Sequence, residues 1–266
     1  MNFCEYLNAV NDWLLFNDLL LNPDKSQCLR VGTRQQLKAC TDSSVDVCGT
    51  LVPCSDSLKL LGVTLDSMLN FDKHVSLICS SAFFQIRALR HIRKQIDEKT
   101  AKTIATTFIA SKLDYCNAIL SGASKHNIKR LQHVQNATAR VVLNTTRGSS
   151  EHLCKSLHWL PISQRIDYKI ALLTFKVAKT ACPSYLFDHL NISKPSRSLR
   201  SSNKGLLFDI PFCKTETASR AFSIYAPKLW NSLPRHIRDT LNKELSTEPV
   251  CTEIEIVKRS LKTFFI

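Results

Sequence analysis

The sequence has few glycines and no paired aspartates, and each shortage argues against a kind of site. Six glycines in 266 residues leave little room for a phosphate-binding glycine loop, and neither common pattern of such a loop occurs. Metal-dependent phosphoryl transfer needs two or three converging carboxylates. The only adjacent acids, Asp97 and Glu98, stand where a helix is predicted to begin and complement its dipole there. On its own residues, the chain does not look like a complete enzyme, and it is expected to hold no cofactor.

Long apolar runs and export signals are also missing. No stretch of about 18 uncharged apolar residues occurs, which argues against a membrane-spanning helix. The first residues contain Glu5 and no basic segment, so we expect an intracellular protein of the cytosol or nucleus that is not secreted. The eleven cysteines form no Cys-x-x-Cys motif and are expected to be reduced thiols that pack as small apolar residues. Cys154 and His158 have the spacing of half a zinc site, but no second pair stands near them.

Charge is the first positive signal. The formal net charge is +14, but it is unevenly distributed. Residues 1–72 hold five Lys and Arg against nine Asp and Glu, whereas residues 73–150 hold thirteen against three. A strongly basic body favours a polyanionic partner, because neutralised phosphates release counterions. The alternative is a basic surface that keeps the protein soluble and binds nothing.

The N-terminal part is predicted to be a small α/β piece. Residues 2–20 have helical apolar spacing, and the residues Asn22-Pro23-Asp24 end that helix. Strands are predicted over residues 26–31, 45–52 and 58–65, with a turn or bulge at the glycine of the second. One helix on three strands leaves an edge and a face uncovered, so this piece is predicted to be incomplete.

Beyond this piece the apolar period becomes helical. Helices are predicted from Phe71 onward, over 98–120 and over 126–143, and together they form a basic three-helix bundle. Phe83, Ile86, Leu89 and Ile92 form the apolar stripe of the first helix, and Ile104, Phe108, Ile109 and Tyr115 are expected to face inward on the second. The C-terminal part is predicted to contain a helix over 161–179, a linker over 194–203, an extended segment over 205–213, and short amphipathic helices over 219–230 and 257–265. The predicted class is therefore α+β and mostly α.

Two basic rows are candidate phosphate-binding sites. Arg87, Arg90, Arg93 and Lys94 lie within two helical turns, close enough to follow one nucleic-acid backbone. Lys129, Arg130 and Arg140 could present a second row on the third helix of the bundle. A solvated helix face without a ligand would have the same composition. The aromatic residues Trp159, Tyr225 and Trp230 are expected to pack in the core, because each has apolar neighbours.

Several sequence blocks, in order, resemble one family. The residues Leu20-Leu21-Asn22-Pro23-Asp24-Lys25-Ser26 look like the segment that follows the catalytic hairpin in the reverse transcriptase of LINE-type (non-LTR) retrotransposons, of the Jockey-like broad group. The later blocks that resemble this family are LGVTLD (61–66), SKLDYCN (111–117), LQHVQNA (131–137), LHWLPI (157–162) and SRAF to WNSLP (219–234).

The resemblance implies a role for each part of the chain. Residues 1–72 would be the end of a palm, 73–150 a thumb-like bundle, 151–193 a helical C-terminal extension, and 194–266 a linker with short helices. Lys25 would lie near the incoming nucleotide, and Leu61, Gly62 and Val63 would grip the primer strand. The family's metal-binding aspartates would precede Met1, so Mg²⁺ is expected only where that catalytic palm is present. The chain is therefore expected to be a fragment.

Three functions remain open from the sequence. The first is a truncated polymerase-derived protein that no longer catalyses synthesis and keeps affinity for the backbone of RNA, DNA or their hybrid. The second is part of an active RNA-directed DNA polymerase whose upstream region is missing. The third is a helical protein-interaction module with no nucleic-acid role. The oligomeric state does not follow from the sequence.

Overall fold

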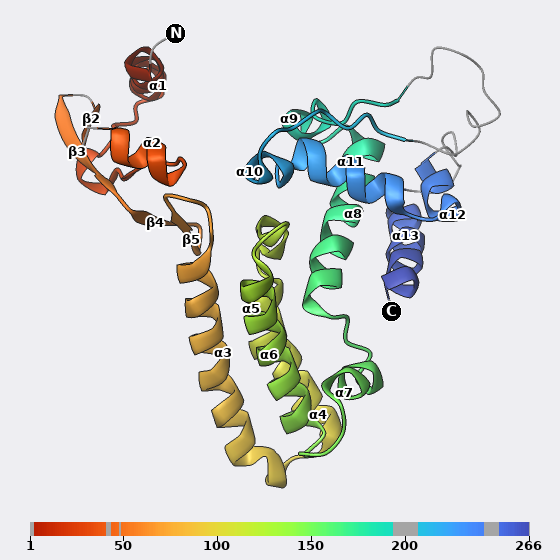
Figure 1. Cartoon of the computed structure of the whole chain (residues 1–266). Coiled ribbons are helices and arrows are strands. Elements are labelled where there is room, and N and C mark those ends of the chain that lie inside the picture. Colours follow the sequence, from red (N-terminus) through yellow and green to blue (C-terminus); the bar gives the residue numbers. More distant parts are fainter. Residues whose placement is uncertain (1–2, 41–43, 48, 194–206, 242–249, 266) are drawn as a thin grey trace. The chain divides into compact units, whose positions relative to one another are not determined.

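The structure is a computed structural model that describes residues 3–40, 44–47, 49–193, 207–241 and 250–265 (Figure 1). The chain divides into two compact units, residues 1–77 and 78–266. Helices dominate and the strands form two small sheets, which confirms the predicted mostly-α α+β class. The division into four parts that the resemblance implies stays a prediction.

The first unit begins with helix α1 (Phe3–Phe16). The predicted helix continued to residue 20, but the observed one stops earlier because Asp18 adopts a left-handed backbone conformation, with φ of 56°. A 3-10 turn, η1 (Pro23–Lys25), follows. Its N-cap is Asn22, whose Oδ1 accepts hydrogen bonds from the backbone N–H groups of Asp24 and Lys25. The residues that were expected to break the helix therefore build a capped turn of their own.

The described residues of the first unit form five strands in place of the three that were predicted. β1 (Cys28–Leu29) runs parallel to β3 (Thr50–Ser55), and β3 pairs antiparallel with β2 (Ser44–Val47). A separate hairpin joins β4 (Ser57–Leu60) to β5 (Val63–Asp66). Two of the predicted strands fold back on themselves because glycines at their centres adopt positive φ angles, 83° at Gly49 and 84° at Gly62.

Helix α2 (Arg34–Ala39) was not predicted. Thr33 and Gln36 form a capping box at its start, in which each side chain bonds the backbone of the other residue. This Thr-x-x-Gln spacing is a helix-start signal that can be read in the sequence.

The second unit contains most of the region that was predicted to form a bundle. Its helices are the part of α3 (Asp72–Ile92) after residue 77, α4 (Glu98–Ala105), α5 (Ser111–Asp114) and α6 (Lys125–Val142), with a π-helical segment, η3 (Thr106–Ala110), between α4 and α5. The N-cap of α4 is Asp97, whose side chain accepts from the N–H of Thr100, as expected for an acid at a helix start.

The predicted second helix of the bundle is too long. It ends at Asp114, because Tyr115 is extended and Cys116 has a φ of 50°, and a 3-10 turn, η4 (Asn117–Leu120), follows. Phe108 and Tyr115 were expected to face inward, but both are more than half exposed. The π-helical segment has more residues per turn than an α-helix, and the helix ends early at Asp114. The residues that face inward therefore do not follow a constant period of 3.6 residues.

The C-terminal elements pack around one long helix, α8 (Ile162–Thr180). Trp230 is fully buried, with its ring centroid 6.4 Å from that of Phe175 on α8, which confirms its predicted place in the core. The other elements of this region are α7 (Ser150–Ser156), α9 (Ser184–Phe187), α10 (Glu216–Ser219), α11 (Phe222–Ser232), α12 (Arg235–Arg238), η5 (Asp239–Leu241) and α13 (Val250–Phe265).

The segment around Phe208 is tied to the core by hydrogen bonds. Phe208 forms an isolated antiparallel bridge with Ile192, and the side-chain amide of Asn231 bonds both its N–H and its carbonyl oxygen, at 3.0 and 2.8 Å. The predicted linker over 194–203 and the first two residues of the predicted extended segment lie outside the described residues. Among the described helices, none has the length and apolar character needed to cross a bilayer.

Candidate nucleic-acid interface

Helices α3 and α6 lie side by side within the second unit and run in the same direction. Near the start of the contact, the Phe83 ring on α3 lies 5.8 Å, centroid to centroid, from the His133 ring on α6. About ten residues further on, Arg93 reaches the last carbonyl groups of α6. The two predicted basic rows therefore lie side by side, the first on α3 and the turn that follows it and the second on α6.

Three members of the first row are exposed. Arg87 and Arg90 lie three residues apart on one side of α3, and Lys94 follows in the 3-10 turn η2 (Arg93–Gln95). None of the ion pairs among the described residues involves these three side chains. Their charges are consequently available to a partner in solution.

The row on α6 is less uniform. Lys129 is exposed, whereas Arg130 and Arg140 are half-buried and bonded to their neighbours. Arg130 donates to Oδ1 of Asn127, and Arg140 donates to the hydroxyl of Ser150 at 2.8 Å. Hydrogen bonds of this kind fix the direction of a guanidinium while leaving some of its five donors for another acceptor.

Arg93 differs from the other members of its row. Like Lys94 it lies in η2, but its guanidinium donates to the carbonyl oxygens of Val141, Val142 and Ile96 at distances between 2.8 and 3.2 Å. A cation that bonds the last carbonyls of a helix also stabilises the negative end of the helix dipole. The structure thus shows a helix-capping role for Arg93, and its predicted contact with phosphate stays a prediction.

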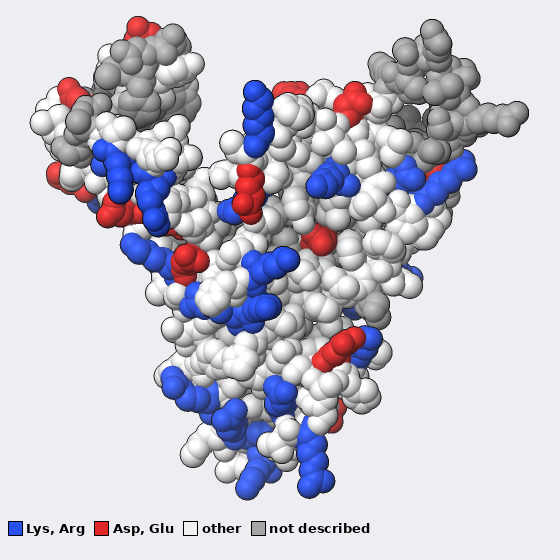
Figure 2. Space-filling view, viewed as in Figure 1, with Lys and Arg blue, Asp and Glu red and all other residues white. Residues whose placement is uncertain are grey.

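The surface of the bundle is predominantly basic. Figure 2 shows Lys and Arg side chains gathered over the end of the bundle where α3 meets α4, with few Asp or Glu side chains among them. Because Lys and Arg gather there with few acidic side chains between them, the local potential is positive and attracts polyanions.

Phe84 is a candidate that the sequence analysis missed. It is 63% exposed on α3, one helical turn before Arg87. Adjacent residues of a helix point about 100° apart, so only one member of the Phe83-Phe84 pair can pack against α6. Two adjacent phenylalanines in a helix were therefore the signal in the sequence that one aromatic ring would be exposed. An exposed aromatic ring beside cations can stack on an unpaired base.

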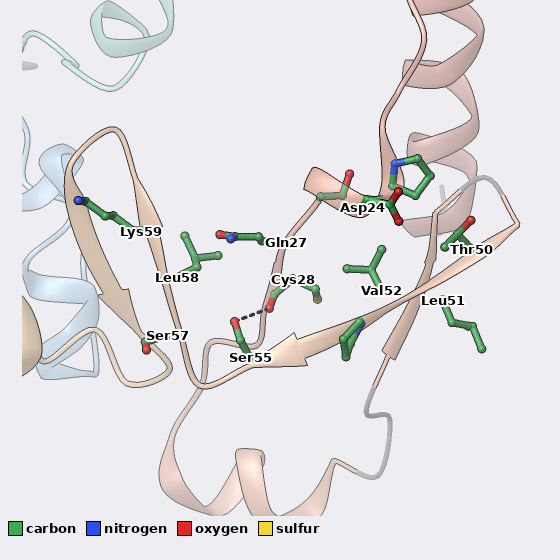
Figure 3. A pocket seen from close by; sticks show the side chains of 13 residues that line it. Asp24, Gln27, Cys28, Thr50, Leu51, Val52, Ser55, Ser57, Leu58 and Lys59 are labelled. Atoms are coloured by element: carbon green, nitrogen blue, oxygen red, sulfur yellow. Dashed lines mark hydrogen bonds between the residues drawn. The ribbon is translucent and has the colours of Figure 1, made fainter.

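Lys25 lies in the first unit, at the end of η1, and is exposed. Its neighbours Pro23 and Asp24 line a pocket of about 510 Å³ to which β1, β3 and β4 also contribute. Figure 3 shows Gln27 and Leu58 on one side of this pocket and Val52 on the other. The hydroxyl of Ser55 on β3 donates to the carbonyl oxygen of Cys28 and fixes one edge.

The predicted primer-grip residues lie at the tip of the β4–β5 hairpin, where Leu61 and Gly62 form the turn and Val63 begins β5. Leu61 is 83% exposed at its tip, whereas Val63 is buried. Both Leu61 and Gly62 have positive φ angles, as a two-residue hairpin turn requires. The contact of this tip with a primer strand stays a prediction.

Residues after the turn have structural roles. The carboxylate of Asp66 accepts hydrogen bonds from the N–H groups of Met68, Asn70 and Phe71 at 3.1, 2.9 and 2.7 Å, and so orders the loop before α3. The buried His74 accepts from the N–H of Thr64 at 3.4 Å, and burial lowers its pKa. Burial therefore favours the neutral form of this imidazole in the folded unit.

The block LQHVQNA on α6 is joined to the block LHWLPI by side-chain amides. Gln132 accepts from the N–H of Ile162 at 2.9 Å, and Gln135 donates to the carbonyl oxygen of Leu160 at 2.8 Å. Gln132 also donates to Gln135 at 3.1 Å and to Asn136 at 2.8 Å. Buried polar groups need such partners, so these blocks hold α6 to the start of α8.

Polymerisation would require acidic residues that hold Mg²⁺. Among the described residues, no three His, Cys, Asp or Glu side chains come together in a way that could hold a metal ion. The expectation that this chain holds no Mg²⁺ stays a prediction. Among the described residues, Cys154 and His158 likewise form no group of three side chains that could hold a metal ion.

A comparison with curated proteins finds a similarity to a transposon protein. The chain is 25% identical, over 162 residues, to a Drosophila melanogaster protein described as "Probable RNA-directed DNA polymerase from transposon BS". The alignment covers 58% of this chain and only 17% of the length of that relative. No protein-family profile and no solved structure matches the chain. The similarity supports a relation to reverse transcriptases.

Proposed function

We propose that the α3–α6 face binds the phosphate backbone of RNA, DNA or an RNA–DNA hybrid. The observation that carries the proposal is the meeting of one basic row on α3 and η2 with a second row on α6, which runs parallel to α3. The Phe83–His133 contact and the bonds from Arg93 to the end of α6 align the two rows. Cations fixed along two adjacent helices can neutralise successive phosphates, which gives binding that depends on salt and tolerates any sequence.

The contributions of the side chains differ. Arg87, Arg90 and Lys94 would act as exposed cations that contact phosphate, and Lys129 would do the same from α6. The hydrogen bond that Arg140 donates to the Ser150 hydroxyl would orient the guanidinium of Arg140. Phe84 would add base stacking where the bound strand is single.

We further assign the origin of the chain to the reverse transcriptase of a LINE-type, Jockey-like retrotransposon, of which it would carry the end of the palm, the thumb-like bundle and the C-terminal extension. The similarity to the transposon polymerase of the fly supports the broader relation. Because the described residues supply no cluster of carboxylates, the chain by itself would bind nucleic acid without extending a primer.

The first experiment measures binding of the full chain to a fluorescent single-stranded RNA and to an RNA–DNA hybrid over a series of salt concentrations. We expect the logarithm of the binding constant to fall linearly with the logarithm of salt, and each lost phosphate contact to reduce the slope by about 0.7 for a single strand. Arg87→Ala, Arg90→Ala and Lys129→Ala should each weaken binding to all sequences alike. Lys228→Ala, which removes an exposed lysine on α11, is the matched control and should leave binding unchanged.

Other outcomes would contradict the proposal. Affinity that is equal at low and high salt would exclude binding through phosphates. A stoichiometric protein partner that stays bound in high salt, with no nucleic-acid binding, would favour an interaction module instead. Extension of a primer by this chain in the presence of Mg²⁺ would show that it is an active polymerase and would overturn the assignment as a binding protein only.

A further inference from the structure

We infer that Cys28 and Cys54 form a redox-sensitive disulfide site in the first unit. The two sulfur atoms lie 3.0 Å apart in the reduced protein. The two residues are direct partners in the register of the parallel strands β1 and β3. This inference concerns a different part of the chain from the proposed nucleic-acid face and does not depend on it.

The strand geometry suits a covalent link. Neighbouring strands of a sheet lie about 4.7–4.9 Å apart, and the Cα atoms of disulfide-bonded cysteines usually lie about 4.4–6.8 Å apart. The Ser55 hydroxyl donates to the carbonyl oxygen of Cys28 at 3.1 Å, which holds the two strands in the same register next to the sulfur pair. Bond formation therefore needs a small approach of the two sulfurs and no change of pairing.

A small oxidant can reach the pair. Cys28 lines the pocket of about 510 Å³ between η1 and the strands (Figure 3). Both cysteines are only half-buried. Burial and the neighbouring Cys54 raise the pKa of Cys28 to about 11, so Cys28 is mostly a thiol at neutral pH. Because the thiolate is the reactive form, oxidation of the pair would begin slowly at neutral pH.

The chemistry balances with a peroxide as the oxidant. One thiol, as its thiolate, attacks an oxygen atom of hydrogen peroxide, which breaks the O–O bond and yields a sulfenic acid and water. The second thiol then attacks the sulfenic sulfur, the S–S bond forms, and a second water leaves with the remaining proton. Two thiols are oxidised by two electrons and one peroxide is reduced to two waters.

The bond would tie the segment after η1 to β3. It would close a loop that contains α2 and β2, since the two cysteines are 26 positions apart in the sequence. A covalent link across such a loop restricts the unfolded chain and raises the resistance of the unit to unfolding. The position of the neighbouring Lys25 segment relative to β3 would then be fixed by a reducible bond.

The test uses the full chain, freed of reductant and treated with hydrogen peroxide, after which free thiols are blocked with iodoacetamide. Trypsin releases Cys28 in the peptide of residues 26–30 and Cys54 in that of residues 39–59, which also contains Cys40 and Cys48. Mass spectrometry should find the two peptides joined, and dithiothreitol should separate them. Cys54→Ser should abolish the joined species, whereas Cys40→Ser and Cys48→Ser should leave it.

A second measurement keeps the test decisive if Cys54→Ser fails to fold. Wild-type protein is oxidised in buffer and, in parallel, in concentrated urea. The fold should make the Cys28–Cys54 pair the main product in buffer, and urea should replace it by a mixture of pairings. Cys28 that remains alkylated after oxidation in buffer, or a joined species that persists in Cys54→Ser, would overturn the inference.

Discussion

The guanidinium of Arg93 closes the C-terminal end of α6 by donating to the carbonyl oxygen of Val142 from Nε and Nη2, at 3.0 and 2.8 Å. The last carbonyls of a helix have no partner within the helix. A side chain that follows α3 therefore supplies the cap of another helix, and in doing so it holds the two basic rows together.

This relationship predicts opposite behaviour for two arginines of the same row. Arg93→Ala should lower the free energy of unfolding by about 3 kcal/mol, because charged hydrogen bonds to half-buried carbonyls are lost, whereas Arg93→Lys should restore part of it. Arg90→Ala should change stability by less than about 0.5 kcal/mol and weaken nucleic-acid binding. Urea denaturation and a binding titration measure the two effects. Reduced binding by Arg93→Ala at unchanged stability would instead identify Arg93 as a phosphate ligand.

The amide network between α6 and the start of α8 gives a second prediction. Gln135 is 1% exposed and donates to the carbonyl oxygen of Leu160. Gln135→Ala should cost about 2 kcal/mol, since a buried acceptor is left unpaired and a cavity forms. Gln95→Ala, at an exposed position of η2, is the matched control and should be nearly neutral. Chemical denaturation followed by circular dichroism measures the difference, and equal midpoints for the two variants would show that the network does not stabilise the fold.

Asp66 gives a third prediction, within the first unit. Its carboxylate accepts three backbone N–H groups in the loop before α3. Asp66→Ala should destabilise this unit by about 2 kcal/mol and accelerate amide exchange at Asn70 and Phe71. Asp12→Ala, at an exposed position on α1, should leave these amides protected. Hydrogen exchange measured by mass spectrometry tests this, and unchanged exchange in Asp66→Ala would contradict the capping role.

Asp167 gives a fourth prediction, on the dependence of stability on pH. Burial raises the pKa of this carboxyl above its usual value of 3.8, although the Tyr225 hydroxyl donates to it at 2.7 Å and opposes the shift. Because the folded pKa is raised, the folded state binds the proton more tightly than the unfolded chain. The stabilising contribution of the carboxyl is full below pH 3.8 and is lost as the pH rises through the folded pKa.

The corresponding variant is Asp167→Asn, which keeps an acceptor for Tyr225 and removes the buried charge. It should be at least as stable as the wild type at pH 7 and should lose the part of the pH dependence that begins above pH 3.8. Thermal unfolding from pH 4 to pH 7 measures this. A steeper decline in Asp167→Asn than in the wild type would show that the ionised form is the stabilising one.

Long helical periods were predictable from the sequence alone. The apolar spacing predicted 126–143 and 161–179, and the observed helices are Lys125–Val142 and Ile162–Thr180. In both, a buried stripe repeats over four or more turns, so one or two irregular residues do not obscure the period. The positive charge of the bundle was predictable for the same reason, because composition does not depend on the exact element ends.

Short elements were harder to predict because single residues decide them. The predicted strand over 58–65 is mostly apolar, and only the positive φ angles of Leu61 and Gly62 turn it into a hairpin. The end of α5 depends likewise on the left-handed conformation of Cys116, a residue type without a strong preference for it. Such backbone conformations are fixed by the packing of the surrounding structure, and the spacing of apolar residues along the sequence does not reveal that packing.

By itself, the sequence determined the class of the fold, the basic character of the bundle and the family that its blocks resemble. The tertiary structure alone decided which basic residues are exposed, because Arg87 and Arg93 have the same charge and lie on consecutive helical elements, yet only the second meets the end of α6. It also decided that the sulfurs of Cys28 and Cys54 meet, since strand pairing joins residues far apart in the chain. Contacts of this kind depend on the packing of whole elements against one another, and no local pattern of residues encodes them.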